Sequence, residues 1–459
     1  MNLRTITNAL FEFDAHYPRT IIATIILITV LFGWKVPGLE MDPGLRSGLP
    51  RDHKIVQSME IVDELFSGSD ILIVAVDSDS LFSTKTLTKL FSFQDSLESL
   101  EQISKVTSIF NQKYIVPDNN GFEIEPVLFE IPRDSVGHQQ LIERLDKSGM
   151  IGNLVSNDYK TLCFIGQINS SFAYDEFEFR KNVYELVNRF SDPEYFYVSS
   201  LPITRATVVE YMQRDMRVFT PVAIGLCIFL LMLSFRSWTG VFLPFFVVGF
   251  SIIWTFGIMG WLDMSLAFIG TLIPVMLVAI ANNYGIHIIS HYYEYTKSDT
   301  KASRGQILKR TIRKVGIPIL LAGVTTMVSF LCLLSHSLPR AREMGALVSF
   351  GILIAFILSI ILIPSVLVLV PRPHFLSKGV DISFIDSLLV KMGKLFTRYR
   401  SIVLILLSIV GIYLAMGIKY LKVDTNPDHY FPKSSTLRIA NAKISNAFGG
   451  STQMNILVE

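Results

Sequence analysis

Residues 41–77 read MDPGLRSGLPRDHKIVQSMEIVDELFSGSDILIVAVD, and residues 423–459 read VDTNPDHYFPKSSTLRIANAKISNAFGGSTQMNILVE. The second stretch repeats the first at a constant offset of 382 residues, with identical residues at the pairs Asp42 and Asp424, Phe66 and Phe448, and Gly68 and Gly450. Self-similarity at a long fixed period indicates a duplicated architecture, and many transporters are built from parallel repeats. We therefore expect one complete half of a duplicated membrane protein plus the opening of its second half, continuing beyond Glu459.

The composition is that of a membrane protein. Half of the residues are hydrophobic and only 17% are charged, with a mean hydropathy of +0.45. A soluble chain of this length carries more charge on its surface. The net charge of +2 argues against nucleic acid as a partner, and three cysteines are too few for a disulfide framework.

Apolar runs of about 20 residues are long enough to cross a bilayer. We expect seven spans, at residues 19–38, 217–235, 240–260, 266–287, 316–335, 344–370 and 401–421. The first run has no small-residue cleavage pattern after it, so it is an anchor rather than a removable signal. Spans two to six, within 217–370, form the expected helical bundle.

The distribution of Lys and Arg predicts the orientation. Basic residues gather before the first span and in the loops after the second, fourth and sixth spans, most densely at 297–314 and 371–400. Basic short loops lie on the cytoplasmic side. We therefore expect a cytoplasmic N-terminus, with an amphipathic segment over 1–18, a cytoplasmic linker over 371–400, and residues 41–215 outside.

The region 41–215 is expected to be one external, porter-like α+β domain. Apolar periodicity and caps predict helices over 52–66, 84–101, 135–147 and 174–190, and strands over 70–77, 104–115, 122–130, 161–168 and 195–200. Two runs of strand, helix and strand are typical of a split βαβ sandwich. Residues 422–459 are expected to open a second, truncated external domain.

One span, an external α+β domain, five spans and then a second round resemble the layout of the resistance–nodulation–division superfamily. The local sequence is similar too, in DMRVFTPVAIGLCIFLLMLSFRSWTGVFLP at 215–244, LAFIGTLIPVMLVAIANNYGIHIISHYYEYT at 266–296 and the run 316–366 containing ILLAGVTTMVSFLCLLS, LPRAREMG and LIPSV. The chain most resembles the MMPL-like exporters, which are related to sterol-sensing domains. This resemblance implies a half-transporter that moves hydrophobic or amphiphilic molecules.

Polar side chains inside spans are costly and mark functional positions. The fourth span carries such residues at Asn282, Asn283, Tyr284 and His287, and the fifth at Thr325, Thr326 and Ser329. Residues four apart share a helix face. We expect a polar, hydrated seam or ion relay between these two spans, with hydrogen bonding between helices as the plainer alternative.

Asn283 departs from the resembled family. Proton-driven relatives carry an aspartate at this position of a Gly-x-Asp-Tyr-x-x-His pattern, and an amide does not exchange a proton near neutral pH. Three alternatives stay open: a second half supplies the carboxylate, His287 titrates instead, or transport is not proton-driven.

Other residues give weaker predictions. Pro274 and Pro364 are expected to kink the fourth and sixth spans. His287 and His291 are four residues apart, but we interpret them as interfacial residues rather than metal ligands. No Walker motif or nucleophile elbow occurs in the sequence, so we expect neither an enzyme nor a cofactor.

The leading hypothesis is an alternating-access exporter of lipid-like molecules in a bacterial inner membrane, driven by an ion gradient if the second half supplies a titratable residue. One alternative is a lipid-binding or sterol-sensing-like regulatory protein without transport; a weaker one is an auxiliary component of protein export. Expected partners are membrane lipids and a hydrophobic or amphiphilic substrate. Partner proteins and a homo-oligomer stay open.

Overall fold

The computed structural model describes residues 17–42, 49–50, 52–65, 70–118, 121–169, 175–235, 237–371, 383–421 and 431–450. Nearly all of the amphipathic segment expected over 1–18, part of the linker, and residues 451–459 lie outside the described residues. The chain divides into two compact units. The helical unit comprises the described residues of 1–40, 216–336 and 341–425, and the α+β unit comprises those of 41–215, 337–340 and 426–459.

Helices make up most of the described part of the helical unit. The helices are α2 (Pro18–Gly33), α7 (Leu201–Phe235, which begins in the α+β unit), α8 (Trp238–Trp261), α9 (Ile273–Ser298), α10 (Arg304–Leu331), α11 (Pro339–Leu369), α12 (Ser383–Arg398) and α13 (Arg400–Met416). Short 3-10 turns are η1 (Val36–Gly38), η3 (Phe268–Leu272), η4 (Cys332–Ser335) and η6 (Gly417–Tyr420), and β8 (Leu266–Ala267) is a two-residue strand. Among the described residues, seven helices are long and apolar enough to cross a membrane. This confirms the predicted fold class.

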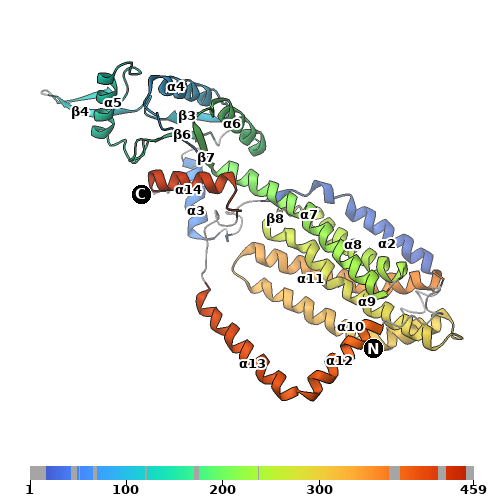
Figure 1. Cartoon of the computed structure of the whole chain (residues 1–459). Coiled ribbons are helices and arrows are strands. Elements are labelled where there is room, and N and C mark those ends of the chain that lie inside the picture. Colours follow the sequence, from blue (N-terminus) through green and yellow to red (C-terminus); the bar gives the residue numbers. More distant parts are fainter. Residues whose placement is uncertain are drawn as a thin grey trace. The chain divides into compact units, whose positions relative to one another are not determined.

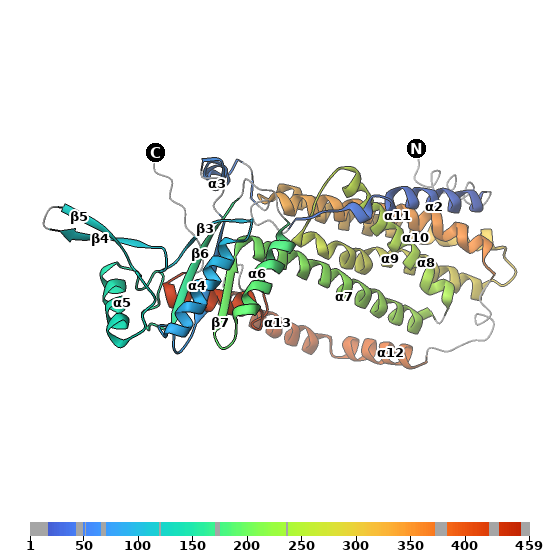
Figure 2. The ribbon, with the colours of Figure 1, turned by 90° about the horizontal axis from the view of Figure 1, so that it is seen from above.

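Small residues and buried hydrogen bonds hold these helices together, as is usual where lipid removes the hydrophobic drive between helices. Figure 2 shows α8, α9 and α10 running side by side. A Cβ at Gly257 of α8 would lie only 2.5 Å from Phe32 Cβ of α2. Nearby, the Trp254 indole donates to Thr29 Oγ1 at 2.9 Å. The close contact between α2 and α8 therefore requires a glycine at position 257.

The α+β unit has the predicted split βαβ topology. Its strands are β1 (Met41–Asp42), β2 (Ile71–Asp77), β3 (Ile103–Thr107), β4 (Lys113–Asp118), β5 (Gly121–Pro126), β6 (Thr161–Ile168) and β7 (Tyr195–Ser200). Its helices are α3 (Lys54–Leu65), α4 (Thr84–Glu98), α5 (Ser135–Lys147), α6 (Glu176–Phe190) and α14 (Thr436–Phe448). The main sheet has the order β3-β6-β2-β7, and its three pairings are antiparallel.

One predicted strand is divided in the structure. Residues 104–115 contain β3, a turn and β4, and β4 pairs with β5 in a separate hairpin. The Asn111 side chain makes the turn, because its oxygen accepts from Ser108 N–H at 3.0 Å and its amide donates to the Val106 carbonyl at 2.5 Å. The expectation of one continuous strand is wrong at this asparagine.

Aromatic side chains fill the core between the sheet and the helices α4 and α6. Phe93 of α4 lies edge-on to Phe164, Phe190 and Phe196, with ring centroids 5.2, 5.5 and 5.0 Å away. Leu72, Val74 and Val76 of β2 are fully buried in the same cluster. Alternate residues of β2 point to the opposite face, where Ala75 is paired with Cys163 and Tyr197 of the neighbouring strands.

Helix α14 packs against the main sheet, although its sequence belongs to the second repeat (Figure 1). Leu437 is only 2% exposed and joins the core cluster. Lys443 Nζ bonds to Asp77 Oδ2 of β2 at 2.7 Å. The described residues 431–450 thus bury part of their apolar surface in the unit that the first repeat forms.

The two repeat-related helices begin at equivalent positions but have different surroundings. Helix α3 starts at Lys54 and α14 at Thr436, which preserves the offset of the sequence repeat. Ile55 is the counterpart of Leu437, yet its side chain is 53% exposed. Equivalent sequence therefore forms a helix twice, and the equivalent residues Ile55 and Leu437 differ in burial.

Candidate functional site

Helix α9 divides the polar residues of the fourth span between two faces. Asn282 and Tyr284 are buried among the helices, whereas Asn283 and His287 are exposed. Successive residues of a helix point about 100° apart, so 283 and 287 share a face that 282 does not. The described chain therefore does not bring these four residues together.

Asn282 joins α9 to α7. Its side chain is 3% exposed, and its Nδ2 donates to Cys227 Sγ of α7 at 2.8 Å. Its Oδ1 is buried and has no hydrogen-bond partner within the described residues. Because an unpaired carbonyl inside a membrane protein is costly, this oxygen is a ready acceptor for water or for a polar group that enters the bundle.

Tyr284 has a similar unpaired polar atom at a different place. Its ring lies edge-on to Phe356 of α11 at 6.1 Å. Its hydroxyl is buried without a partner among the described residues, and it lies near Gly323 of α10, where an added Cβ would be 3.4 Å away. Asn282 and Tyr284 thus form the buried polar part of the predicted seam.

The hydroxyls of α10 are satisfied by their own helix. Thr325 donates to the Leu321 carbonyl at 2.9 Å, Thr326 to Ala322 at 2.8 Å, and Ser329 to Thr325 at 2.8 Å. Such bonds to the preceding turn are the common way for Ser and Thr to be paired in apolar surroundings. Among the described residues these three hydroxyls therefore bond within α10, and none of them bonds to Asn282 or Tyr284.

The two proline predictions have different outcomes. Pro274 lies in the first turn of α9, where the N–H that proline lacks has no helical partner in any case. It starts the helix after the 3-10 turn η3 and does not kink its interior, which corrects the prediction. Pro364 lies inside the unbroken helix α11.

The two histidines of α9 differ in their surroundings. His287 is exposed, and His291 Nδ1 lies 2.8 Å from Glu294 Oε2. Within the described ranges, no group of three or more metal-ligating side chains is close enough to hold an ion.

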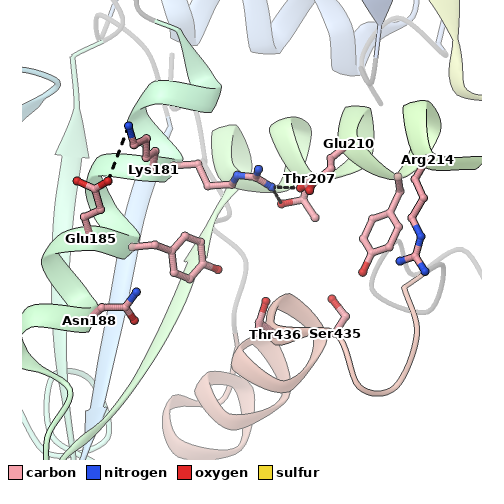
Figure 3. A pocket seen from close by; sticks show the side chains of 11 residues that line it. Lys181, Glu185, Asn188, Thr207, Glu210, Arg214, Ser435 and Thr436 are labelled. Carbon is pink, nitrogen blue, oxygen red and sulfur yellow. Dashed lines mark hydrogen bonds and ion pairs between the residues drawn. The ribbon is translucent and has the colours of Figure 1, made fainter. Parts of the chain in front are cut away.

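A cavity of about 510 Å³ lies in the α+β unit between α6, α7 and the start of α14 (Figure 3). Its lining residues are Arg180, Lys181, Tyr184, Glu185, Asn188, Thr207, Glu210, Tyr211, Arg214, Ser435 and Thr436. Every one of them carries a polar side-chain atom. The cavity is therefore suited to a polar rather than an aliphatic group.

The charges of this cavity are only partly neutralised within it. Arg180 Nη1 pairs with Glu210 Oε2 at 2.7 Å, and Lys181 Nζ lies 3.8 Å from Glu185 Oε1. Arg214 has no ion pair with any described residue and points from α7 toward the start of α14 (Figure 3). Three cations face two carboxylates, so the lining has an excess of one positive charge.

Hydroxyl groups surround this charge. Ser435 is the N-cap residue of α14 but makes no capping bond with its side chain, so its hydroxyl remains available to the cavity. Burial raises the pKa of Tyr184, against the opposing effects of a hydrogen bond with Thr436 and of the Arg180 charge. The phenol is therefore a neutral hydroxyl at physiological pH.

Sequence reasoning did not find this cavity. Arg180 and Lys181 lie in an ordinary charged helix, and Ser435 and Thr436 lie more than 200 residues away in the second repeat. The sequence did contain a signal, because the segments 180–184 and 211–214 each hold an arginine and a tyrosine. This signal becomes informative only once α6 and α7 are known to be neighbours.

Comparison with known proteins extends over both units. The model of the MMPL family matches residues 47–381. A protein of Methanocaldococcus jannaschii, whose name describes it only as a membrane protein, is 22% identical over 387 residues, which cover 81% of this chain and 95% of that protein. The transport protein MmpL12 of Mycobacterium tuberculosis is 21% identical over 235 residues, which cover 49% of this chain and 20% of MmpL12.

Proposed function

The chain belongs to the MMPL family, and from this premise we propose that it is a membrane transporter that exports hydrophobic or amphiphilic, lipid-like molecules. The seven long apolar helices among its described residues make it an integral membrane protein. The observation that carries the proposal is the family match over residues 47–381, which includes both the extramembrane α+β unit and most of the membrane helices.

The polar positions of α9 suggest where an ion could act. Asn283 and His287 are exposed on one face of this helix, and an exposed polar face within a span needs a polar partner from elsewhere. In this proposal, a group that covers this face completes the relay, because Asn283 itself cannot titrate. In this proposal, His287 shares that face with Asn283 and belongs to the same relay.

One observation favours a second candidate function, a lipid-binding regulatory protein without transport. The neutral Asn283 stands where proton-driven relatives of the resembled superfamily carry a carboxylate, so this half of the bundle lacks the expected proton acceptor. A regulatory protein would bind the same amphiphiles and move none of them.

Vesicle transport separates these functions. The full chain is reconstituted in lipid vesicles, and movement of a fluorescent lysophospholipid is followed under an imposed proton or sodium gradient. Flux above that of protein-free vesicles, abolished by collapsing one gradient with an ionophore, is the expected result. Binding without flux would favour the regulatory function, and neither binding nor flux by folded protein would contradict both.

A further inference from the structure

We propose that the cavity between α6, α7 and α14 binds the anionic head group, a phosphate or a carboxylate, of the transported amphiphile. This inference rests on the proposed function and adds the chemical class of the substrate's polar end. It places the binding site in the α+β unit, whereas the polar residues of α9 belong to the helical unit.

Arg214 is the first reason for an anionic ligand. The two other cations of the lining already have carboxylate partners at 2.7 and 3.8 Å, whereas Arg214 has none among the described residues. A guanidinium matches the geometry of a phosphate or carboxylate and binds it with two parallel hydrogen bonds. An anion near Arg214 would neutralise the excess positive charge of the cavity.

The uncharged lining is the second reason. The hydroxyls of Ser435 and Thr436 point toward α7 (Figure 3), and the phenols of Tyr184 and Tyr211 also border the cavity. Hydroxyls that donate to an anion are the usual companions of an arginine in such sites. Every lining residue thus carries at least one polar side-chain atom that can contact a head group.

The size of the cavity is the third reason. Small-molecule sites commonly occupy about 300–1,000 Å³, and the volume here is about 510 Å³. This space accommodates a phosphoglycerol or a comparable head group. Because Ser435 and Thr436 come from the second repeat and the other lining residues from the first, the site is complete only when α14 is docked.

The test measures binding of two probes to the full chain in phosphatidylcholine nanodiscs. Glycerol 3-phosphate is the soluble probe, and lysophosphatidic acid carries the same phosphate on an acyl chain. Replacing Arg214→Gln removes a charge-assisted interaction, so the affinity for both anions is expected to fall by about 10-fold to 100-fold. Arg189→Gln is the matched control, because it removes the same charge from α6 outside the cavity.

Two further comparisons distinguish a soluble ligand from a lipid and show whether binding requires the negative charge. Similar affinities for both probes would assign the site to soluble phosphate esters, whereas tighter binding of lysophosphatidic acid would assign it to lipids; either result supports an anion site. Binding that is unchanged in Arg214→Gln, or equally tight binding of neutral monoacylglycerol, would overturn the inference. Flux of the fluorescent lysophospholipid by the wild-type chain in vesicles tests the proposed function separately, since that measurement does not depend on the binding of either probe.

Discussion

Replacing Leu437→Ala should detach α14 from the α+β unit more often than any change to its polar contacts. The Leu437 side chain is 2% exposed, and truncating such a leucine costs about 2–5 kcal/mol in well-packed cores. The ion pair between Lys443 and Asp77 is partly exposed, at 35% and 23%, and pairs of that kind contribute only about 0.2–1 kcal/mol. Apolar burial therefore dominates the docking of this helix.

The expected magnitude follows from this loss. An isolated helix as short as α14, with 13 residues, is marginal in water, so undocking should expose its backbone amides. A loss of about 3 kcal/mol raises the opening constant about 100-fold. Amide hydrogen exchange of residues 437–448, measured by mass spectrometry on the full chain, should accelerate by that order.

A matched control lies on the same helix. Ile439 is 46% exposed, so Ile439→Ala removes a similar apolar group without leaving a cavity and should change exchange by less than about 5-fold. Exchange in Leu437→Ala that stays at the wild-type rate, or equal acceleration in both variants, would refute the reasoning. Glycerol 3-phosphate binding should weaken with Leu437→Ala, because the cavity loses its second-repeat wall.

Three further predictions concern stability and reactivity. Burial raises the pKa of Cys163 to about 12, so at pH 8 only about one thiol in 10⁴ is ionised, and iodoacetamide should label it only after denaturation. Burial raises the pKa of Glu194, but the hydrogen bond and charge of Lys89 oppose it, and the pKa lies below its ordinary value. The lowered pKa stabilises the folded state above about pH 4.3. This stabilisation is lost as pH falls through the lowered pKa. Glu194→Gln should therefore cost about 1–3 kcal/mol at pH 7 and flatten this acid dependence. Gly257→Ala forces a clash at the α2 contact and should cost about 1–3 kcal/mol, whereas Gly249→Ala, at a site with no heavy atom within 4 Å of the new Cβ, should not destabilise.

Each of these results has a contrary outcome. Labelling of native Cys163 at the rate of a free thiol would show that β6 is not buried as described. Acid unfolding curves that coincide for wild type and Glu194→Gln would remove the role of the Lys89 pair. Equal melting temperatures for the two glycine variants in detergent would show that α2 does not need the close approach at position 257.

Part of the candidate site was accessible from sequence, and the part that was missed has a physical reason. Polar residues inside spans are visible in any hydropathy pattern, which is why Asn282 and Tyr284 could be singled out. Whether a residue faces neighbouring helices or the outside depends on which helices surround it. This is why Asn283 and His287 separate from Asn282, although the sequence places them side by side.

The sequence by itself determined the local features of this protein: seven apolar helices, the repeat, and the strands and helices of the split βαβ unit. These features depend on the length and period of apolar runs, which neighbouring residues alone define. Only the tertiary structure decided that α14 completes the first repeat's unit and that a charged cavity lies beside it. Those outcomes depend on contacts such as Lys443 with Asp77, which lie 366 residues apart, and on packing that leaves Ile55 exposed while burying its counterpart Leu437.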